Sequence, residues 1–230
     1  MEPFSPASAE KGGSMKMISQ LLEVLYPSCC PGCGKATLPD KLWCKDCLSL
    51  FWNPRLLNSS FTKHVSGCYT LCDYDEGIRR VLIGLKYGDK TEYKRAFPEL
   101  LDAFPYWDRL SACHMAIPVP LSKKRKRERR YNQVDMIFQD WLEHHGWEYA
   151  REGLSRVRNT RVQSLLDKEQ RRLNMKGAFH VHHGITVKGK DLLLLDDVYT
   201  TGITLEEAAS ELKRMGAHTV IGLTLASGAR

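Results

Sequence analysis

Four consecutive leucines occupy positions 192–195, directly after Asp191 and before Asp196. The run is too short for an independent helix and has the length of a parallel strand buried on both faces. Two acids, Asp196 and Asp197, follow it, and the small polar group Thr200-Thr201-Gly202 comes next. Ligands of α/β proteins bind at the carboxyl ends of parallel strands, so we expect a binding site here.

A helical pattern begins at Thr204, directly after these polar residues. Its apolar residues recur at spacings of three and four, and they are Leu205, Ala208, Ala209, Leu212 and Met215. Thr204 and Glu207 fit a capping box, and Gly216 stands where helices commonly end. We therefore predict that the N-terminus of this helix points at the end of the leucine strand.

The residue types around this turn predict a specific chemistry. Amides at a helix start, with threonine hydroxyls beside them and a glycine that allows close approach, suit a phosphate group; these residues are Thr200, Thr201, Gly202 and Thr204. The carboxylates of Asp196 and Asp197 would accept hydrogen bonds from sugar hydroxyls or hold a divalent cation such as magnesium. The stretch therefore predicts a site for a phosphorylated sugar.

Strand and helix patterns alternate along most of the remaining chain. We predict strands at 114–119, 147–154, 177–181 and 219–226, and helices at 78–85, 91–104, 131–146 and 165–175. The basic residues 123–130 fall in a predicted loop after the rigid Pro118-Val119-Pro120. This alternation predicts an α/β fold with a parallel sheet that is covered by helices on both faces.

A cysteine cluster precedes these elements. Cys30, Cys33, Cys44 and Cys47 form two CxxC pairs separated by ten residues, and four thiolates complete a tetrahedron around zinc. Because no ligand position remains open, we predict a structural ion whose binding stabilises a small knuckle. Cys29 could compete as a ligand, although its spacing to Cys33 is less usual.

Length and composition are those of a soluble globular protein. The 230 residues are 43% apolar and 27% charged, which suffices for one core and a small accessory unit. The first residues lack the apolar region of a signal peptide, so we expect a cytoplasmic protein with reduced thiols and no membrane insertion. We place a disordered extension at 1–14, the zinc knuckle at 15–50 and the main domain at 51–230; translation could begin at Met15.

The net charge of +7 is unevenly distributed. Seven of the eight residues at 123–130 are basic, and a second basic group covers 151–176. Such patches suit phosphate-rich partners, and a solvated basic surface explains them equally well.

The leucine strand with its acids and threonines, LLLLDDVYTTGIT, resembles the phosphoribosyl pyrophosphate (PRPP) motif of the type I phosphoribosyltransferases. From about residue 26 onward the chain also resembles the ComF/GntX family of competence proteins. Four blocks carry this second resemblance: the CxxC pairs, Leu85-Lys86-Tyr87, the Pro-Val-Pro loop with residues 129–133, and residues 196–204. In the third block the family commonly has Arg-Gly-Phe-Asn-Gln, whereas this chain has Arg-Arg-Tyr-Asn-Gln.

The resemblance implies a type I phosphoribosyltransferase fold with an N-terminal zinc knuckle. Asp196 and Asp197 would then bind the ribose hydroxyls and act as the catalytic carboxylates, and Thr200, Thr201, Gly202 and Thr204 would bind the 5-phosphate. Six basic residues are candidates for contact with pyrophosphate or nucleic acid: Lys123, Lys124, Arg125, Arg129, Arg158 and Arg161. Magnesium would accompany PRPP.

Three functions remain open at this point. The resemblance favours a PRPP-binding competence protein that acts in DNA uptake during natural transformation, with single-stranded DNA and a competence ATPase or helicase as partners. The alternative is a small-molecule phosphoribosyltransferase of nucleotide or base metabolism with an unknown acceptor. A third hypothesis is that the zinc knuckle is a docking module for a partner protein.

Overall fold

The structure, a computed structural model, describes residues 28–38, 41–57, 63–87, 91–129, 131–157 and 175–229. The expected extension at 1–14, Met15, and the candidates Arg158 and Arg161 lie outside these ranges, as does the predicted helix at 165–175 apart from Met175. Seven strands are described: β1 (Trp52–Leu57), β2 (Gly67–Asp73), β3 (Met115–Pro118), β4 (Leu154–Arg156), β5 (Phe179–Val181), β6 (Asp191–Tyr199) and β7 (Thr219–Ser227). The described helices are α2 (Lys45–Phe51), α3 (Glu76–Tyr87), the 3-10 helix η1 (Thr91–Ala96), α4 (Phe97–Asp102), α5 (Trp107–Leu110), α6 (Lys123–Arg129), α7 (Gln133–His144) and α9 (Ile203–Arg214).

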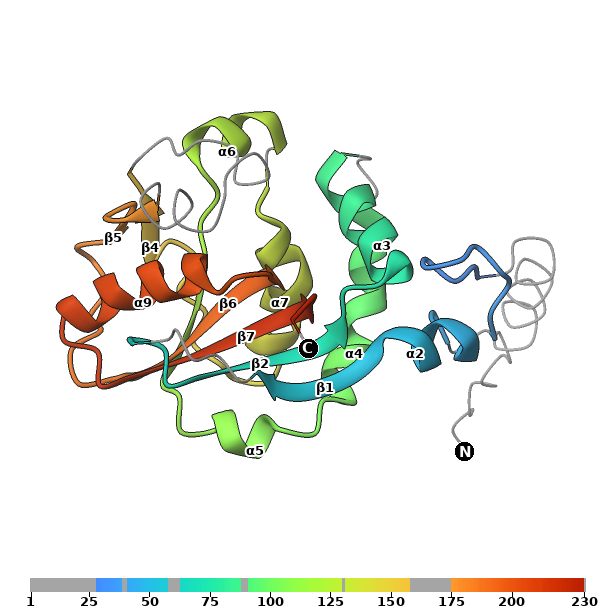
Figure 1. The fold of residues 1–230 in the computed structure, drawn as a ribbon, viewed down its shortest axis with the longest axis horizontal. Coiled ribbons are helices and arrows are strands. Elements are labelled where there is room, and N and C mark those ends of the chain that lie inside the picture. The colour runs from blue at the N-terminus through green and yellow to red at the C-terminus, as the bar shows by residue number, and fades with distance from the viewer. Residues whose placement is uncertain are drawn as a thin grey trace, which may run out of the picture.

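A five-stranded sheet lies at the centre of the described chain (Figure 1). Its strand order is β1-β2-β7-β6-β3, so the leucine strand β6 lies between two parallel neighbours. Strand β2 is also parallel to β7, whereas β1 pairs with β2 in the antiparallel direction at the edge. The predicted parallel sheet is confirmed. The antiparallel edge strand and the small antiparallel β4-β5 sheet were not predicted.

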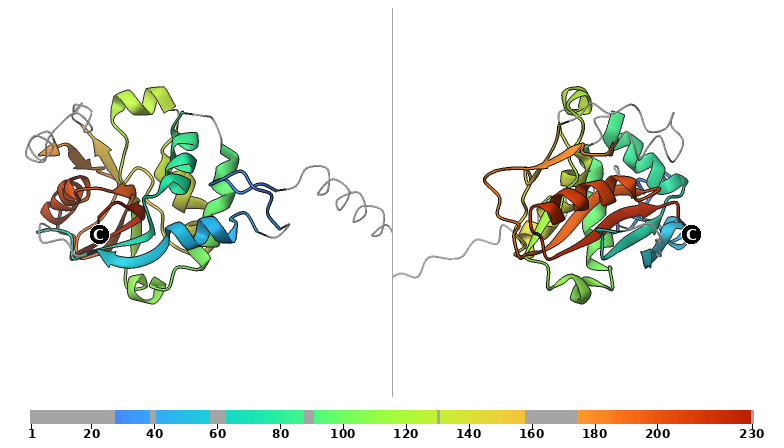
Figure 2. Two further views of the ribbon diagram at one scale, coloured as in Figure 1. Left: turned by 45° about the vertical axis from the view of Figure 1, so that its right-hand side comes forward. Right: turned by 60° about the vertical axis from the view of Figure 1, so that its left-hand side comes forward.

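Strand β6 is buried on both faces because its successive side chains point to opposite sides of the sheet. Leu193 and Leu195 pack in the core that contains residues of α3, α4 and α7. Leu192 and Leu194 pack in the second core, with residues of α9 and β5. The views in Figure 2 show α9 and α7 on opposite faces of the sheet. The four-leucine run is therefore the sequence expected of a strand covered on both faces.

Several predicted boundaries differ from those of the structure. Strand β6 does not end at Leu195 but continues to Tyr199, so both acids lie within the strand. The predicted helix at 91–104 is divided into η1 and α4, and Pro98 stands in the first turn of α4, where its missing N–H is tolerated. The predicted strand at 147–154 contains only a single bridge, from Tyr149 to Ala116, before β4 begins.

The basic residues after β3 form a helix rather than a loop. Helix α6 covers Lys123–Arg129, and its first turn follows Ser122, whose carbonyl accepts from the Lys126 N–H at 2.9 Å. The sequence prediction was wrong here because it continued the loop after Pro118-Val119-Pro120 through the charged run, whereas lysine and arginine are good helix formers.

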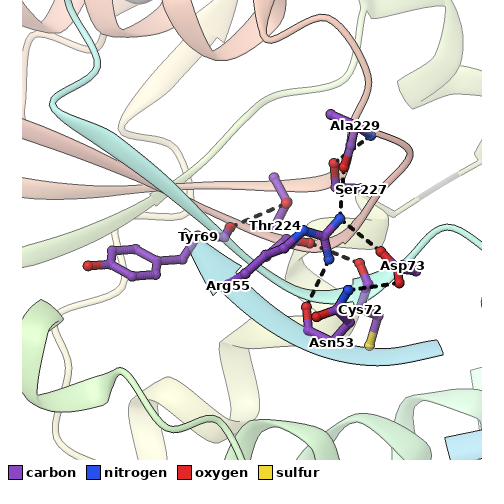
Figure 3. A network of polar contacts seen from close by, with 9 residues as sticks. Asn53, Arg55, Tyr69, Cys72, Asp73, Thr224, Ser227 and Ala229 are labelled. Carbon is purple, nitrogen blue, oxygen red and sulfur yellow. Dashed lines mark hydrogen bonds and ion pairs between the residues drawn. The ribbon is translucent and has the colours of Figure 1, made fainter. Parts of the chain in front are cut away.

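Arg55 connects the edge strand to the end of β7 (Figure 3). Its guanidinium lies 2.8 Å from a carboxylate oxygen of Asp73 and donates to the Ala229 carbonyl at 2.8 Å. The Asn53 amide donates to the same carboxylate of Asp73 at 3.0 Å. Side-chain contacts therefore supplement the backbone ladder at this edge.

Strand β1 itself is irregular. Its pairing with β2 shifts register between Trp52 and Arg55, and Pro54 stands within this interval. Proline has no backbone N–H, so it occurs in sheets mainly on edge strands and at bulges. The outer edge of the sheet is thus interrupted near its start.

The cysteine-rich segment packs on the main core through Trp43. This side chain is 2% exposed, its indole N–H donates to the Ala96 carbonyl at 2.7 Å, and its ring meets Phe51 edge to face at 4.7 Å. Cys30 and Cys47 belong to the same buried cluster. Among the described residues, no helix combines the length and the apolar character that a membrane span requires.

Candidate functional site

The two acids lie at the carboxyl end of β6, between the ends of β3 and β7. Asp196 is in register with Thr224 of β7, and the backbone N–H of Asp197 donates to Oδ1 of Asp196 at 2.8 Å. The two carboxylates are thus consecutive on a strand and held by its ladder. Both residues are half-buried.

Lys86, in the last turn of α3, forms an ion pair with Asp197. The two side chains are only 22% and 18% exposed, so the contact is sheltered from solvent. Lys86 was not among the predicted site residues. The signal that could have identified it was its position in the Leu85-Lys86-Tyr87 block, which sequence analysis used only as evidence of family resemblance.

The electrostatic environment gives the two acids different properties. Burial and, next, the adjacent charge of Asp197 raise the pKa of Asp196 to about 8, while the Lys86 charge acts in the opposite direction. Near neutral pH Asp196 therefore retains a proton beside a carboxylate that Lys86 balances. A carboxyl group that donates next to one that accepts suits a pair of vicinal hydroxyls, because each hydroxyl both donates and accepts.

The polar turn after the acids leads directly into α9. Gly202 has φ +72°, and a Cβ at this position would lie 2.5 Å from the Tyr199 hydroxyl, so glycine is required for both conformation and space. The first bond of the helix runs from the Glu206 N–H to the Gly202 carbonyl at 2.9 Å. The backbone N–H groups at positions 203–205 therefore lie in the first turn of α9, next to the end of β6, and a helix N-terminus of this kind is an arrangement that binds phosphate.

The predicted cap of this helix is wrong. The helix begins at Ile203 rather than Thr204, and its N-cap is Gly202, which makes no side-chain capping bond. The reason is the positive φ of Gly202, which turns the chain into the helix one residue early and places Thr204 inside the first turn. The predicted helix end is confirmed, since Gly216 has φ +94°.

Glu206 fixes the first turn of α9 to the segment that precedes β2. Its carboxylate accepts the backbone N–H groups of Lys63 at 2.8 Å, His64 at 3.0 Å and Val65 at 3.3 Å, and Nδ1 of His64 lies 2.9 Å away. The start of the helix is therefore held in place by contacts on the side of β2 as well as by β6.

The basic candidates occupy different positions. Arg129 donates to Oε1 of Gln133 at 3.1 Å and to the Tyr87 hydroxyl at 2.9 Å, and its guanidinium lies 4.8 Å from the centre of the Tyr87 ring. Arg125 is half-buried, and the backbone of Lys123 and Lys124 lies in the first turn of α6. Figure 1 shows α6 and the end of α3 on the same side of the molecule.

Arg156 of β4 is a second residue near the site that sequence reasoning did not single out. Burial, as the main cause, and the charge of Arg125 lower its pKa to about 10, while the charge of Asp196 acts in the opposite direction. Its Nη2 lies 3.0 Å from the sulfur of Met175. Arg156 lies inside the basic group 151–176, and this charge was the only sequence signal for it.

The predicted metal ligands converge. The sulfur atoms of Cys30, Cys33, Cys44 and Cys47 all lie within 4.8 Å of one another, and those of Cys33 and Cys44 are 3.6 Å apart. Four sulfurs at about 2.3 Å from one tetrahedral zinc lie about 3.8 Å apart, so this set fits the ion. The Lys35 backbone N–H, as the main cause, lowers the pKa of Cys33 to about 7, which favours the thiolate that binds metal. Cys29 is exposed and outside this group.

Comparison with known proteins agrees with this geometry. A sequence model described as phosphoribosyl transferase domain matches residues 152–230, which include the acid pair and the polar turn. DNA utilization protein YhgH of Escherichia coli O157:H7 is 32% identical over 200 residues, which cover 83% of this chain and 80% of that protein. Competence protein ComFC of Bacillus subtilis (strain 168) is 30% identical over 202 residues, or 85% of this chain and 76% of the relative.

The chain belongs to the ComF family. Competence protein ComFC of Streptococcus pneumoniae R6, at 27% identity over 83% of this chain, is a further relative. The family resemblance inferred from the four sequence blocks is therefore confirmed, and so is the combination of a phosphoribosyltransferase-type sheet with an N-terminal group of four cysteines.

The cysteine geometry leads to a first prediction. The purified chain should contain about one zinc per molecule, and Cys33→Ser should remove the ion and lower the thermal unfolding midpoint, because metal binding supplies folding free energy to the knuckle. Cys29→Ser is the matched control and should retain the metal. Elemental analysis and thermal unfolding measure both effects; full zinc content in Cys33→Ser would contradict the assignment.

The raised pKa of Asp196 leads to a second prediction. Its unfolded pKa is about 3.9, so between about pH 4 and pH 8 the folded chain holds a proton that the unfolded chain loses, and the free energy of unfolding decreases as the pH rises. Asp196→Asn has no side-chain proton to lose, so it avoids the free-energy cost of burying a group that would otherwise be ionised. It should be more stable than the native chain at pH 8, by on the order of 1–3 kcal/mol, with a smaller difference at pH 4. Urea unfolding at both pH values measures it.

Asp191→Asn is the control for this experiment, since it changes an aspartate at the other end of the same strand. Hydrogen bonds from Thr219 and His218 lower the pKa of Asp191, so its replacement should destabilise the chain above pH 4. A loss of stability in Asp196→Asn at pH 8 would mean that the carboxylate is not destabilised by its surroundings.

Proposed function

We propose that the chain binds PRPP or another phosphoribosyl compound at the carboxyl end of β6, and that it acts in DNA uptake during natural transformation. The proposed phosphoribosyl site rests on one observation: the half-buried acid pair is followed, after one short turn, by a helix whose N-cap is a glycine. A phosphorylated sugar carries its hydroxyls and its phosphate several bonds apart, as the acids and the helix start are separated here.

Each part of a phosphoribosyl group has a counterpart in the site. The amides at 203–205 and the hydroxyls of Thr200, Thr201 and Thr204 suit the 5-phosphate. Asp196 and Asp197 suit the two ribose hydroxyls, one as donor and the other as acceptor. Arg125, half-buried in the first turn of α6, is a described basic side chain that suits the pyrophosphate.

The same groups suit phosphoribosyl transfer. An acceptor attacks the anomeric carbon, pyrophosphate leaves with the bonding electron pair, and positive charge develops on the ribose ring in the transition state. The Asp197 carboxylate can stabilise that charge, and basic side chains can stabilise the leaving group. Magnesium bound with PRPP would add to the neutralisation of the pyrophosphate.

The proposed role in DNA uptake draws on the names of the relatives, which refer to competence and DNA utilization. It is supported by the surface of α6, where Lys126 and Arg127 are exposed. Nearby, Tyr87 is 76% exposed and carries Arg129 on its ring. Cations together with an exposed aromatic ring are the features that bind single strands of nucleic acid.

The alternative is a small-molecule phosphoribosyltransferase with a base or metabolite as acceptor. Such an enzyme would use the same sugar-phosphate site, but its acceptor would be a small molecule rather than DNA. Pyrophosphate release from PRPP with a small acceptor, in the absence of DNA, would favour the alternative; PRPP binding without such turnover favours the competence role.

Binding of PRPP tests the acid pair directly. Isothermal titration with PRPP and magnesium should show binding to the native chain, and Asp196→Ala and Asp197→Ala should each weaken it about 10-fold to 100-fold, because each removes a hydrogen bond that involves a carboxyl group. Asp191→Ala, at the opposite end of β6, should bind as the native chain does. Absence of PRPP binding to the native chain would exclude this site assignment.

Binding of single-stranded DNA tests the basic surface. The affinity should decrease with rising salt, because bound DNA releases the counterions of the phosphates that the protein neutralises. In the double variant Lys126→Gln with Arg127→Gln, the slope of log affinity against log salt should fall by roughly 0.7 for each contact removed. The pair Lys45→Gln and Lys188→Gln removes equal charge elsewhere and should leave the slope unchanged. An affinity that does not depend on salt would contradict the proposal.

A further inference from the structure

Arg129, the last residue of α6, and Tyr131, which precedes α7, hold the last turn of α3 at two points, one on either side of Lys86. The Tyr131 hydroxyl donates to the Leu85 carbonyl at 2.6 Å. Arg129 donates from Nη2 to the Tyr87 hydroxyl at 2.9 Å and lies over the ring of the same tyrosine. We call these two contacts the α3 clamp.

The α3 clamp contacts the C-terminal end of α3. Leu85 lies among the last four residues of α3, whose carbonyls have no partner within the helix, and such ends tend to fray. Tyr131 supplies a donor to one of these carbonyls. Since Lys86 follows directly, the clamp limits the backbone freedom of the residue whose ammonium must reach Asp197.

The clamp is attached to a rigid base. Gln133, which accepts from Arg129, is 1% exposed and stands in the first turn of α7. Asn132 accepts from the Val134 N–H at 3.3 Å as the N-cap of α7, and its amide donates to the Val119 carbonyl at 3.0 Å. Val119 follows β3, the direct neighbour of β6. The clamp and the acid pair are thus held by adjacent strands of one sheet.

We propose that Tyr131 and Arg129 are positioning residues of the acid pair, which hold the end of α3 so that Lys86 remains on Asp197. Neither residue needs to touch the ligand for this role. The consequence for PRPP affinity rests on the proposed function, whereas the hold on Lys86 does not.

A double-mutant cycle separates this role from a general effect on the fold. Tyr131→Phe removes only the hydroxyl and should weaken PRPP binding about threefold to tenfold, the range of one neutral hydrogen bond. In the Lys86→Met background the same change should have no further effect, because the side chain being positioned is gone. Equal weakening in both backgrounds, or no weakening in either, overturns the proposal.

Tyr149→Phe is the matched control for the cycle. It also removes a tyrosine hydroxyl from a half-buried hydrogen bond, in this case a bond of 2.9 Å to Asp135. It should leave PRPP affinity unchanged while it lowers stability to a similar extent as Tyr131→Phe. Weaker PRPP binding in both variants would attribute the effect to stability and overturn the positioning role.

A measurement without ligand keeps the inference distinct from the proposed function. Brief acylation of the ligand-free chain, followed by mass spectrometry, compares Lys86 with Lys94, an exposed lysine paired with Asp140 at 3.2 Å. The ion pair of Lys86 with Asp197 is sheltered from solvent and therefore from the reagent, whereas that of Lys94 is exposed, so Tyr131→Phe should increase the ratio of Lys86 to Lys94 labelling severalfold. An unchanged ratio overturns the proposal. If the native chain does not bind PRPP, the proposed function fails and this ratio alone decides the positioning role.

Discussion

Two adjacent carboxylates in a sheltered position repel each other and lose hydration, and the structure around β6 compensates for both costs. Lys86 balances Asp197, and Asp196 retains its proton to higher pH. The contacts that maintain this arrangement come from distant parts of the sequence, because α3 precedes β6 by about a hundred residues. The acid pair therefore depends on the assembled sheet and cannot be reproduced by its own segment alone.

The strand and the polar binding site at its end were predictable from sequence, because a run of four leucines between acids is typical of a strand buried on both faces. The sequence could not predict where the strand ends, since pairing with Thr224 of β7 continues β6 through both acids. It missed the start of α9 because a helix signal based on side-chain caps does not include a glycine whose positive φ begins the helix. Lys86 and Arg156 were missed for a different reason: a lysine or arginine acquires a role here only through a partner far away in the chain.

The cysteine group was the easiest site to predict, since its ligands are close in sequence and their spacing reflects local turns. Its relation to the rest of the fold was not predictable from that spacing. Trp43, between the two CxxC pairs, enters the main core and bonds to Ala96. The knuckle is therefore built onto the face of the sheet that carries α3, the helix that supplies Lys86, and the two sites share one hydrophobic core.

The irregular edge of the sheet determines how other chains can attach to it. A strand added to β1 would need a continuous row of backbone donors and acceptors, and this row is interrupted by Pro54 and the nearby shift of register. The side chains of Arg55 and Asn53 are already engaged with Asp73. Self-association by strand pairing along β1 is thereby disfavoured, so partners are expected to meet this side of the chain through side chains rather than through an added strand.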